Sequence, residues 1–197
     1  MVVGLPQSMV REAGMFELLA AEMRIAELEA ELAEARDAAC TDPLTGALNR
    51  RGFDNASRRE LSRARRSGAP LALVHVDLDD FKQVNDTFGH QVGDRALCQL
   101  VSVLQRSMRP SDVLCRFGGE EFVLMFPETS LQSATKAVAR FLREFSAQTI
   151  PGARRSMTFS AGVVVARPDE SLEDAIQRAD AATYAAKSAG KNSVVAG

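Results

Sequence analysis

Apolar residues recur at helical spacing near the start of the chain. They follow one another at intervals of three and four positions (Leu18, Ala21, Ile25, Leu28, Leu32 and Ala35). Charged residues, mostly glutamates, occupy the remaining faces of this stretch. The spacing is typical of about three heptads of a coiled coil, although alanines weaken the apolar seam. Because an isolated helix of this length is marginal in water, the segment needs a partner helix or a domain surface.

The composition changes around residues 37–41, where a segment rich in Ala, Glu and Leu gives way to mixed sequence with turns. We therefore predict an N-terminal helical segment over residues 1–40 and one globular domain over residues 41–197. Two arrangements of the first segment are open: a parallel stalk that joins two copies, or a single amphipathic helix packed on the domain. We favour the stalk.

Helical and strand-like patterns alternate through the second segment. Residues 50–66, the stretch after Gly93, residues 130–145 and residues 171–189 have helical patterns. Apolar or β-branched runs predict strands at 71–76, 113–116, 122–126, 156–166 and 193–195. Elements in this order predict a mixed sheet surrounded by helices.

The composition suits one well-cored domain and an appendage, since the chain has 197 residues of which 46% are hydrophobic. The net charge of −2 leaves no basic excess to hold a nucleic acid polymer. The arginine-rich stretch at 58–66 contains no aromatic residues and is more typical of a solvated helix face. We therefore expect no nucleic acid partner.

Cysteine usage and the absence of long apolar runs indicate the compartment. Cys40, Cys98 and Cys115 lie far apart with no C-x-x-C pair, which favours a reducing environment and buried or half-buried thiols. The first ten residues lack the basic start and unbroken apolar run of a secretory signal. No apolar stretch reaches the roughly 20 residues that span a bilayer. We expect a soluble, cytoplasmic chain without a membrane segment.

Acidic residues gather where two of these strands end or begin. Asp77 follows the buried strand at 71–76, and Glu120 with Glu121 precedes the strand at 122–126, in a pattern typical of a β-hairpin turn. If the two strands are neighbours, three carboxylates converge, and such hard oxygen donors suit Mg²⁺. Turns are also acidic simply because they are polar, so the spacing alone leaves both interpretations open.

The pair Gly118-Gly119 favours the functional interpretation. Two residues without side chains allow a nucleotide to approach the backbone. Lysines are available to balance phosphate charge (Lys82, Lys187 and Lys191). These residues together indicate a metal-dependent site for a nucleotide.

The run Gly118-Gly119-Glu120-Glu121-Phe122 resembles the signature of the GGDEF family of diguanylate cyclases, in its GGEEF form. Other segments match the family in order and with compatible spacing: Asp42-Pro43-Leu44-Thr45, Asn49-Arg50-Arg51, Asp77-Leu78-Asp79-Asp80-Phe81-Lys82, Asn85-Asp86-Thr87-Phe88-Gly89-His90, Gly93-Asp94, Tyr184-Ala185-Ala186-Lys187 and Gly190-Lys191-Asn192. The similarity extends over residues 41–195.

The resemblance implies a fold and an activity. The fold is an α+β domain similar to the palm of polymerases and class III nucleotide cyclases, with a largely antiparallel central sheet. The activity is condensation of two GTP into cyclic di-GMP and two pyrophosphates, by two domains that meet face to face. A homodimer is then part of the mechanism, and a stalk would raise the effective concentration of the two domains.

The resemblance also assigns metal-binding roles, residue by residue. Asp77, the Leu78 carbonyl and Glu121 match metal ligands, with Mg²⁺ or Mn²⁺ as the ion. Glu120 matches a position that is either a ligand or the base for the attacking 3′-hydroxyl, and the sequence leaves these roles open.

Asn85 and Asp94 match the family's guanine-reading positions. A carboxylate can accept hydrogen bonds from the N–H donors of guanine, which adenine lacks, so the match implies GTP over ATP. The other matching GTP contacts are Phe81, Lys82, Gly118, Gly119, Lys187 and Lys191. Lys191 stands where many relatives carry arginine, so its contact would be a point charge in place of a bidentate fork.

Arg109 and Asp112 resemble the R-x-x-D inhibitory motif at the family's usual offset before the glycine pair. Arginine can bond O6 and N7 of guanine while the aspartate takes its N–H groups, so the motif implies a product site and feedback inhibition. A surface turn with a local salt bridge is the structural alternative.

Other assignments complete the sequence-based picture. We expect His75 to be a core or sheet-face histidine and His90 to have a packing role in a loop. Two other functions are open: a catalytically silent receptor for cyclic di-GMP or GTP, and a coiled-coil adaptor. Crowded, unneutralised carboxylates argue against both.

Overall fold

The computed structural model describes residues 7–153 and 155–197, and it separates into two compact units that divide between Ala39 and Cys40. Helix α1 (Gln7–Cys40) forms nearly all of the first unit. The described apolar side chains of its seam are about half exposed, among them Ile25, Leu28 and Leu32. Arg24 and Glu27 form an ion pair at 2.9 Å on its surface. The N-terminal helix is as predicted, and a coiled coil remains a proposal.

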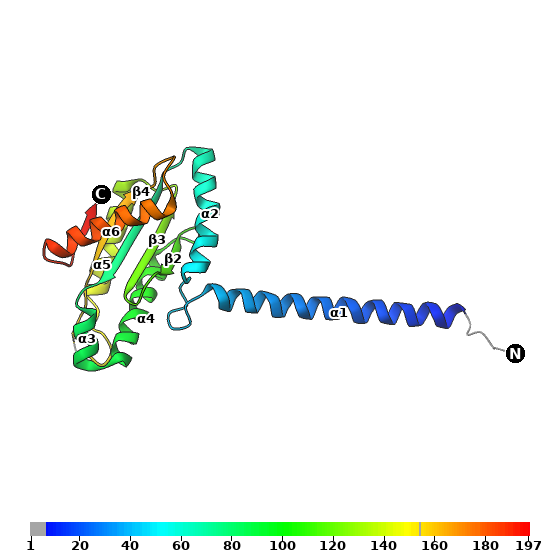
Figure 1. Cartoon of the computed structure of the whole chain (residues 1–197). Helices are drawn as coiled ribbons and strands as arrows, with labels where there is room; N and C mark the ends of the chain where they lie inside the picture. Colours follow the sequence, from blue (N-terminus) through cyan, green and yellow to red (C-terminus); the bar gives the residue numbers. More distant parts are fainter. Residues whose placement is uncertain (1–6, 154) are drawn as a thin grey trace. The chain divides into compact units, whose positions relative to one another are not determined.

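A five-stranded sheet forms the centre of the second unit (Figure 1), in the order β2-β3-β1-β4-β5. The strands are β1 (Leu71–Leu78), β2 (Val113–Arg116), β3 (Glu121–Pro127), β4 (Phe159–Val165) and β5 (Val194–Ala196). All neighbours are antiparallel except β4 and β5, which are parallel. The α+β fold with a mostly antiparallel central sheet is therefore confirmed.

Helices cover both faces of this sheet. In Figure 1, α6 crosses in front of the strands and α5 lies behind them. Side chains of β1 alternate between the faces: Val74 and Val76 join the core with α3 (Phe81–Phe88), α4 (His90–Ser107) and α5 (Leu131–Ser146). Leu71 and Leu73 join the core with α2 (Arg50–Ser67) and α6 (Leu172–Ser188). This alternation decides which functional side chains share a face.

The elements begin and end at residues with clear local reasons. The Asn49 side chain accepts a hydrogen bond from the Gly52 N–H at 3.0 Å and so caps the start of α2. Gly68 ends the same helix with a φ of 70°. Ser130 and Ser171 cap α5 and α6 in the same way as Asn49.

Helix α3 is the main difference from the sequence-based prediction. Residues 81–88 form two helical turns, in which only Phe81 and Val84 are buried. So few apolar positions give no recognisable period. His90, expected in a loop, is the first residue of α4, where it is exposed, so the loop assignment was wrong.

The described cysteines are free, with Cys115 buried and Cys40 and Cys98 half-buried, as predicted. Among residues 7–153 and 155–197, no helix is long and apolar enough to cross a membrane.

Candidate active site

The register of two central strands brings candidate metal ligands together. Asp77 of β1 lies directly opposite Glu121 of β3. Directly paired residues point to the same face, and His75 points there too because it is two residues before Asp77. The convergence predicted for these two carboxylates follows from this pairing.

The glycine pair forms the turn between β2 and β3. The backbone N–H groups of Phe117 and Gly118 both donate to the Glu121 carbonyl, at 2.8 and 3.1 Å. A Cβ at Gly118 would collide with the Glu121 carboxylate, whereas a Cβ at Gly119 would have open space. Gly118 therefore leaves room for the Glu121 side chain as it is placed here, a reason that the sequence did not reveal.

Asp77 is partly neutralised by a helix from the same face. Lys187 of α6 places its Nζ at 2.7 Å from Asp77 Oδ2, and the Asp77 side chain is only 13% exposed. The second oxygen, Oδ1, is buried and has no hydrogen-bond partner. An orphaned buried carboxylate oxygen is costly, and a bound cation would satisfy it.

Glu120 is the other carboxyl group with an altered environment. Burial raises the pKa of Glu120, the charges of Asp77 and Glu121 raise it further, and Lys187 opposes them. Like charges crowded at one site leave a carboxylate prone to hold a proton or a cation.

The three carboxylates do not form a preassembled metal cage. Within residues 7–153 and 155–197, no group of three or more His, Cys, Asp or Glu side chains is arranged to hold an ion. The backbone N–H of Leu78 donates to the Glu120 carbonyl at 3.3 Å, so the hairpin turn adjoins the end of β1. The carboxylates of Asp77, with its unpartnered oxygen, and of Glu121 fit a metal. The rest of the metal's coordination shell would come from a nucleotide and water.

His75 is a buried neighbour of this site, as expected. Its Nδ1 lies 3.1 Å from the Thr183 hydroxyl, and its ring nitrogens lie 3.8 Å from Glu121 and 3.6 Å from Asp180. Burial lowers the pKa of His75 by more than the charges of Asp180 and Glu121 raise it, so the imidazole is neutral at pH 7.

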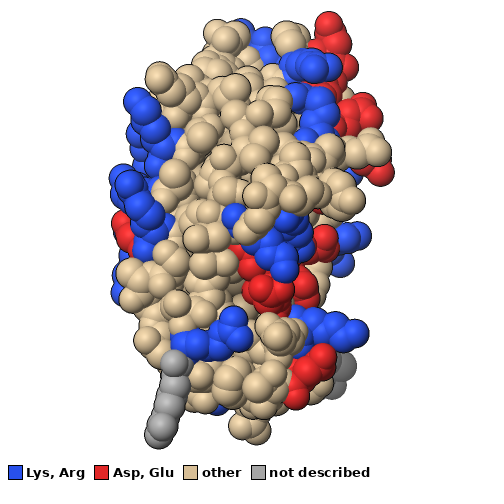
Figure 2. All heavy atoms as spheres, turned by 90° about the vertical axis from the view of Figure 1, so that its left-hand side faces the viewer, with Lys and Arg blue, Asp and Glu red and all other residues tan. Residues whose placement is uncertain are grey.

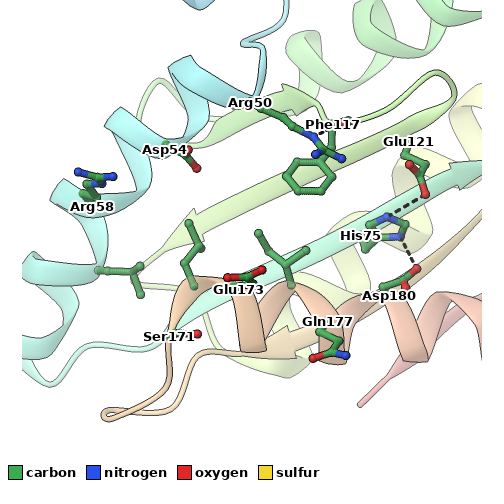
Figure 3. A pocket seen from close by; sticks show the side chains of 13 residues that line it. Arg50, Asp54, Arg58, His75, Phe117, Glu121, Ser171, Glu173, Gln177 and Asp180 are labelled. Carbon is green, nitrogen blue, oxygen red and sulfur yellow. Dashed lines mark hydrogen bonds and ion pairs between the residues drawn. The ribbon is translucent and has the colours of Figure 1, made fainter.

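His75 also lies on the floor of a groove of about 830 Å³ between α2, α6 and the β2–β3 hairpin. Figure 3 shows Glu121 and Asp180 reaching the imidazole from opposite sides. The Arg50 guanidinium lies 4.1 Å from the centre of the Phe117 ring, and both residues line the groove.

The guanine-reading candidates lie on two neighbouring helices. Asn85 belongs to α3, and its Oδ1 is buried without a partner. Asp94 is exposed on α4. A Cβ at Gly93 would collide with the Asn85 amide, so glycine is what leaves room for that side chain. A buried, unpaired amide oxygen is available to a ligand donor.

The remaining nucleotide-binding candidates differ in their surroundings. Phe81 is 8% exposed and belongs to the core, whereas Lys82 is exposed. Lys191 donates to Asp80 at 2.6 Å. In Figure 2, basic and acidic side chains adjoin one another in the middle of the face shown. Of the lysines, Lys187 lies against the metal candidates, and Lys191 and Asp80 form a separate ion pair.

Asp79 is a buried anchor that the sequence did not single out. Its carboxylate accepts hydrogen bonds from the hydroxyls of Ser160 and Thr158 at 2.7 and 2.6 Å, and from the Asn192 N–H at 3.0 Å. It therefore ties the end of β1 to the segment that carries Lys191. The sequence shows Asp79 within the Asp77–Lys82 motif, but the residues that it bonds are distant in sequence and could not be named from it.

The inhibitory-motif residues form a local turn. The Asp112 carboxylate accepts a hydrogen bond from the Arg109 backbone N–H at 2.8 Å, and burial raises the pKa of Asp112. Both residues line a cavity of about 320 Å³ with Lys136 and Arg140 of α5. Basic side chains around a partly buried aspartate suit an anionic ligand that also carries N–H donors.

Comparison with known proteins identifies the domain. The family model for "Diguanylate cyclase, GGDEF domain" matches residues 39–193, about four-fifths of the chain. The chain belongs to the GGDEF family.

Curated relatives carry the same GGDEF domain within longer proteins. Diguanylate cyclase DgcP of Pseudomonas aeruginosa is 39% identical over 163 residues, which are 82% of this chain and 24% of DgcP. Response regulator PleD of Caulobacter vibrioides is 36% identical over 173 residues, which are 85% of this chain and 38% of PleD. The chain thus spans well under half the length of these relatives.

Solved GGDEF structures agree with the fold. The coiled coil and GGDEF domain of DgcB from Caulobacter crescentus, in complex with c-di-GMP, matches with a TM-score of 0.86 and 31% identity over 93% of this chain and 98% of that one. The active GGEEF domain of a diguanylate cyclase from Vibrio cholerae matches with a TM-score of 0.72 and 31% identity, over 75% and 96% of the two chains.

Proposed function

We propose that this chain is a diguanylate cyclase that condenses two GTP molecules into cyclic di-GMP and two pyrophosphates. The observation that carries the proposal is the pairing of Asp77 with Glu121 beside the glycine turn, with a buried Asp77 oxygen that has no protein partner. Membership of the GGDEF family supports the same chemistry.

Asp77, the Leu78 carbonyl and Glu121 would hold the metal, Mg²⁺ or Mn²⁺, with Glu120 as a further ligand or as the base. When bound, the ion would neutralise phosphate charge and lower the pKa of the attacking hydroxyl. Lys187 adjoins Asp77 at 2.7 Å and would supply positive charge to a phosphate bound beside it. Lys82 and Lys191 would supply further positive charge.

Guanine would be read by the amide of Asn85 and the carboxylate of Asp94, on the adjoining ends of α3 and α4. The carboxylate accepts from the N1–H and the 2-amino group of guanine, which adenine cannot offer in the same pattern. Gly93 keeps the space that the Asn85 side chain needs. GTP is therefore the proposed substrate.

Each domain binds one GTP, so two domains must face each other. The 3′-hydroxyl oxygen of one GTP bonds to the α-phosphorus of the other, the bond to pyrophosphate breaks, and the hydroxyl proton passes to a base, which is Glu120 where that residue is not a metal ligand. The same step then occurs with the roles of the two nucleotides exchanged, which closes the ring and releases the second pyrophosphate. The raised pKa of Glu120, caused first by burial, makes its carboxylate a better proton acceptor. The active form is a homodimer, which a stalk made of α1 would assemble.

Product inhibition is the proposed role of Arg109 and Asp112. The cavity of about 320 Å³ that they line has basic side chains of α5 on its other wall, which supports binding of a dinucleotide's phosphates and guanine edges. Cyclic di-GMP bound there would restrain the domain.

A catalytically silent receptor for GTP or cyclic di-GMP is the second candidate. The ion pair between Lys187 and Asp77 favours it, since this pair already neutralises part of the charge of a candidate metal ligand. A receptor would bind the nucleotide without releasing pyrophosphate.

Product analysis separates these two functions. The purified chain is incubated with GTP and Mg²⁺, beside a Glu120→Gln variant, and the nucleotides are separated by chromatography. Cyclic di-GMP formed by the parent and absent with Glu120→Gln supports the cyclase. Bound nucleotide without any product at any protein concentration supports the receptor.

A further inference from the structure

Arg116 joins the glycine turn to the segment that enters the domain. It is the last residue of β2, and its side chain is only 17% exposed. Its Nε and Nη2 both donate to the Gly119 carbonyl, at 3.2 and 2.8 Å. Two bonds from one planar guanidinium to one oxygen fix the plane of the peptide between Gly119 and Glu120.

The other side of the guanidinium is held by Asp42. Arg116 Nη1 lies 3.2 Å from both Asp42 carboxylate oxygens. Asp42 is itself fixed, because its Oδ1 accepts from the Thr45 N–H at 2.9 Å and from the Thr45 hydroxyl at 2.6 Å. Burial raises the pKa of Asp42, but the bonds from Thr45 and Arg116 outweigh it and lower the pKa below its usual value.

The backbone makes the same connection. The Arg116 N–H donates to the Leu48 carbonyl at 2.8 Å, and the Leu48 N–H donates to the Leu114 carbonyl at 3.0 Å. Leu48 thus pairs with the outer edge of β2, and Asp42 follows the last residue of α1 by two positions.

Among the described residues, Arg116 is the one side chain that donates to the Gly119 carbonyl. No heavy atom lies within 4 Å of the place where its Cβ would be, and the residue is exposed. The direction of the next side chain, Glu120, depends on the plane of this peptide. The Leu78 N–H holds the Glu120 carbonyl at 3.3 Å, and the Arg116 bonds hold the Gly119 carbonyl on the other side of Glu120, so the Arg116 bonds help to set where the Glu120 carboxylate points.

We propose that Arg116 is a positioning residue that orients Glu120 through the Gly119 carbonyl, and that Asp42 holds Arg116 in place. This inference rests on the proposed cyclase function and adds a control point to it. The turn that follows α1 thereby sets the geometry of the hairpin. Arg116 acts on catalysis only through Gly119, whereas Asp42 acts only through Arg116.

The first test is Arg116→Lys, since lysine keeps the charge beside Asp42 and loses the two-bond contact with Gly119. We expect kcat to fall about tenfold to a hundredfold while KM for GTP changes less than about threefold, because misplaced catalytic groups cost rate more than binding. Arg95→Ala is the matched control, because Arg95 Nε also donates to a backbone carbonyl, that of Pro151, at 2.8 Å. A parent-like kcat in Arg116→Lys would overturn the proposal.

Amide hydrogen exchange gives a readout without turnover. The Phe117 and Gly118 N–H groups are bonded within the hairpin, and we expect both to exchange at least about tenfold faster in Arg116→Lys, with core amides unchanged. Unchanged hairpin exchange contradicts the proposal. If the parent makes no cyclic di-GMP, the cyclase function fails, and this exchange result still decides the role of Arg116.

A double-mutant cycle tests whether Asp42 acts through Arg116. Asp42→Asn should lower kcat in the parent and have no further effect in an Arg116→Ala background, since coupled residues are not additive. Costs that multiply independently would show that Asp42 does not act through Arg116. The thermal unfolding of each variant is measured alongside, and Arg116→Lys replaces Arg116→Ala in the cycle if the latter is unfolded.

Discussion

At the scale of single residues, the site owes its form to groups that are missing as much as to groups that are present. Asn85 fits because Gly93 has no side chain, and the Glu121 carboxylate fits because Gly118 has none. Asp77 keeps one oxygen without a partner. Each of these residues could be named from the sequence through its motif. The physical reason for each glycine could not, since it depends on a neighbour several positions away.

Guanine recognition is testable at this scale. Asp94→Asn removes an acceptor for the guanine N–H groups, so we expect GTP affinity to fall about tenfold or more, equivalent to about 1.4 kcal/mol or more. The preference for GTP over inosine triphosphate, which lacks the 2-amino group, should also shrink. Asp86→Asn is the control, since Asp86 is exposed on α3. Unchanged affinity and preference in Asp94→Asn would remove it from the guanine site.

At the scale of elements, helical spacing and runs of apolar or β-branched residues predicted most of the helices and strands. The sheet order was outside the reach of the sequence, because β1 pairs with β3 and β4 through contacts between distant segments. The same is true of Lys187, which meets Asp77 only because α6 packs on β1. Helix α3 was not predicted, because its two turns bury only Phe81 and Val84 and so show no helical spacing of apolar residues.

The start of α6 supplies a pH-dependent prediction. Glu170, 7% exposed, accepts from Arg178 at 2.6 and 2.8 Å, and these bonds lower the pKa of Glu170 despite burial. Glu170→Gln should therefore cost about 2 kcal/mol of unfolding free energy at pH 7. A depressed pKa contributes stability above the unfolded value of 4.5, so the difference should disappear as the pH falls through the folded pKa.

Chemical denaturation at pH 7 and near pH 3 measures the unfolding free energy of the parent and of Glu170→Gln. Glu173→Gln, in the exposed first turn of the same helix, is the control. A cost for Glu170→Gln that stays constant over this range would show that the carboxylate charge is not the source of the stability.

At the scale of the whole molecule, the proposed condensation of two GTP molecules would bring two copies of the chain together. The described seam residues of α1 are about half exposed, which leaves apolar surface for a second helix. Deleting residues 1–37 should lower specific activity in dilute solution, and the loss should shrink as protein concentration rises. Activity assays over a hundredfold range of concentration check this. Equal activity at all concentrations would contradict a dimerising stalk.

Feedback control belongs to the same scale. Arg109→Ala should relieve inhibition by added cyclic di-GMP while leaving the initial rate nearly unchanged, because Arg109 lies in a cavity separate from the Asp77 site. Arg106→Ala is the control, since Arg106 is an exposed residue near the end of α4. Undiminished inhibition in Arg109→Ala would refute the assignment of the product site.

The most direct test of the central claim is the ratio of pyrophosphate to cyclic di-GMP released from GTP and Mg²⁺ over time. Condensation of two GTP molecules through two ring-closing steps predicts two pyrophosphates for each cyclic di-GMP. Pyrophosphate without the cyclic dinucleotide, or bound nucleotide with neither product, would contradict the account.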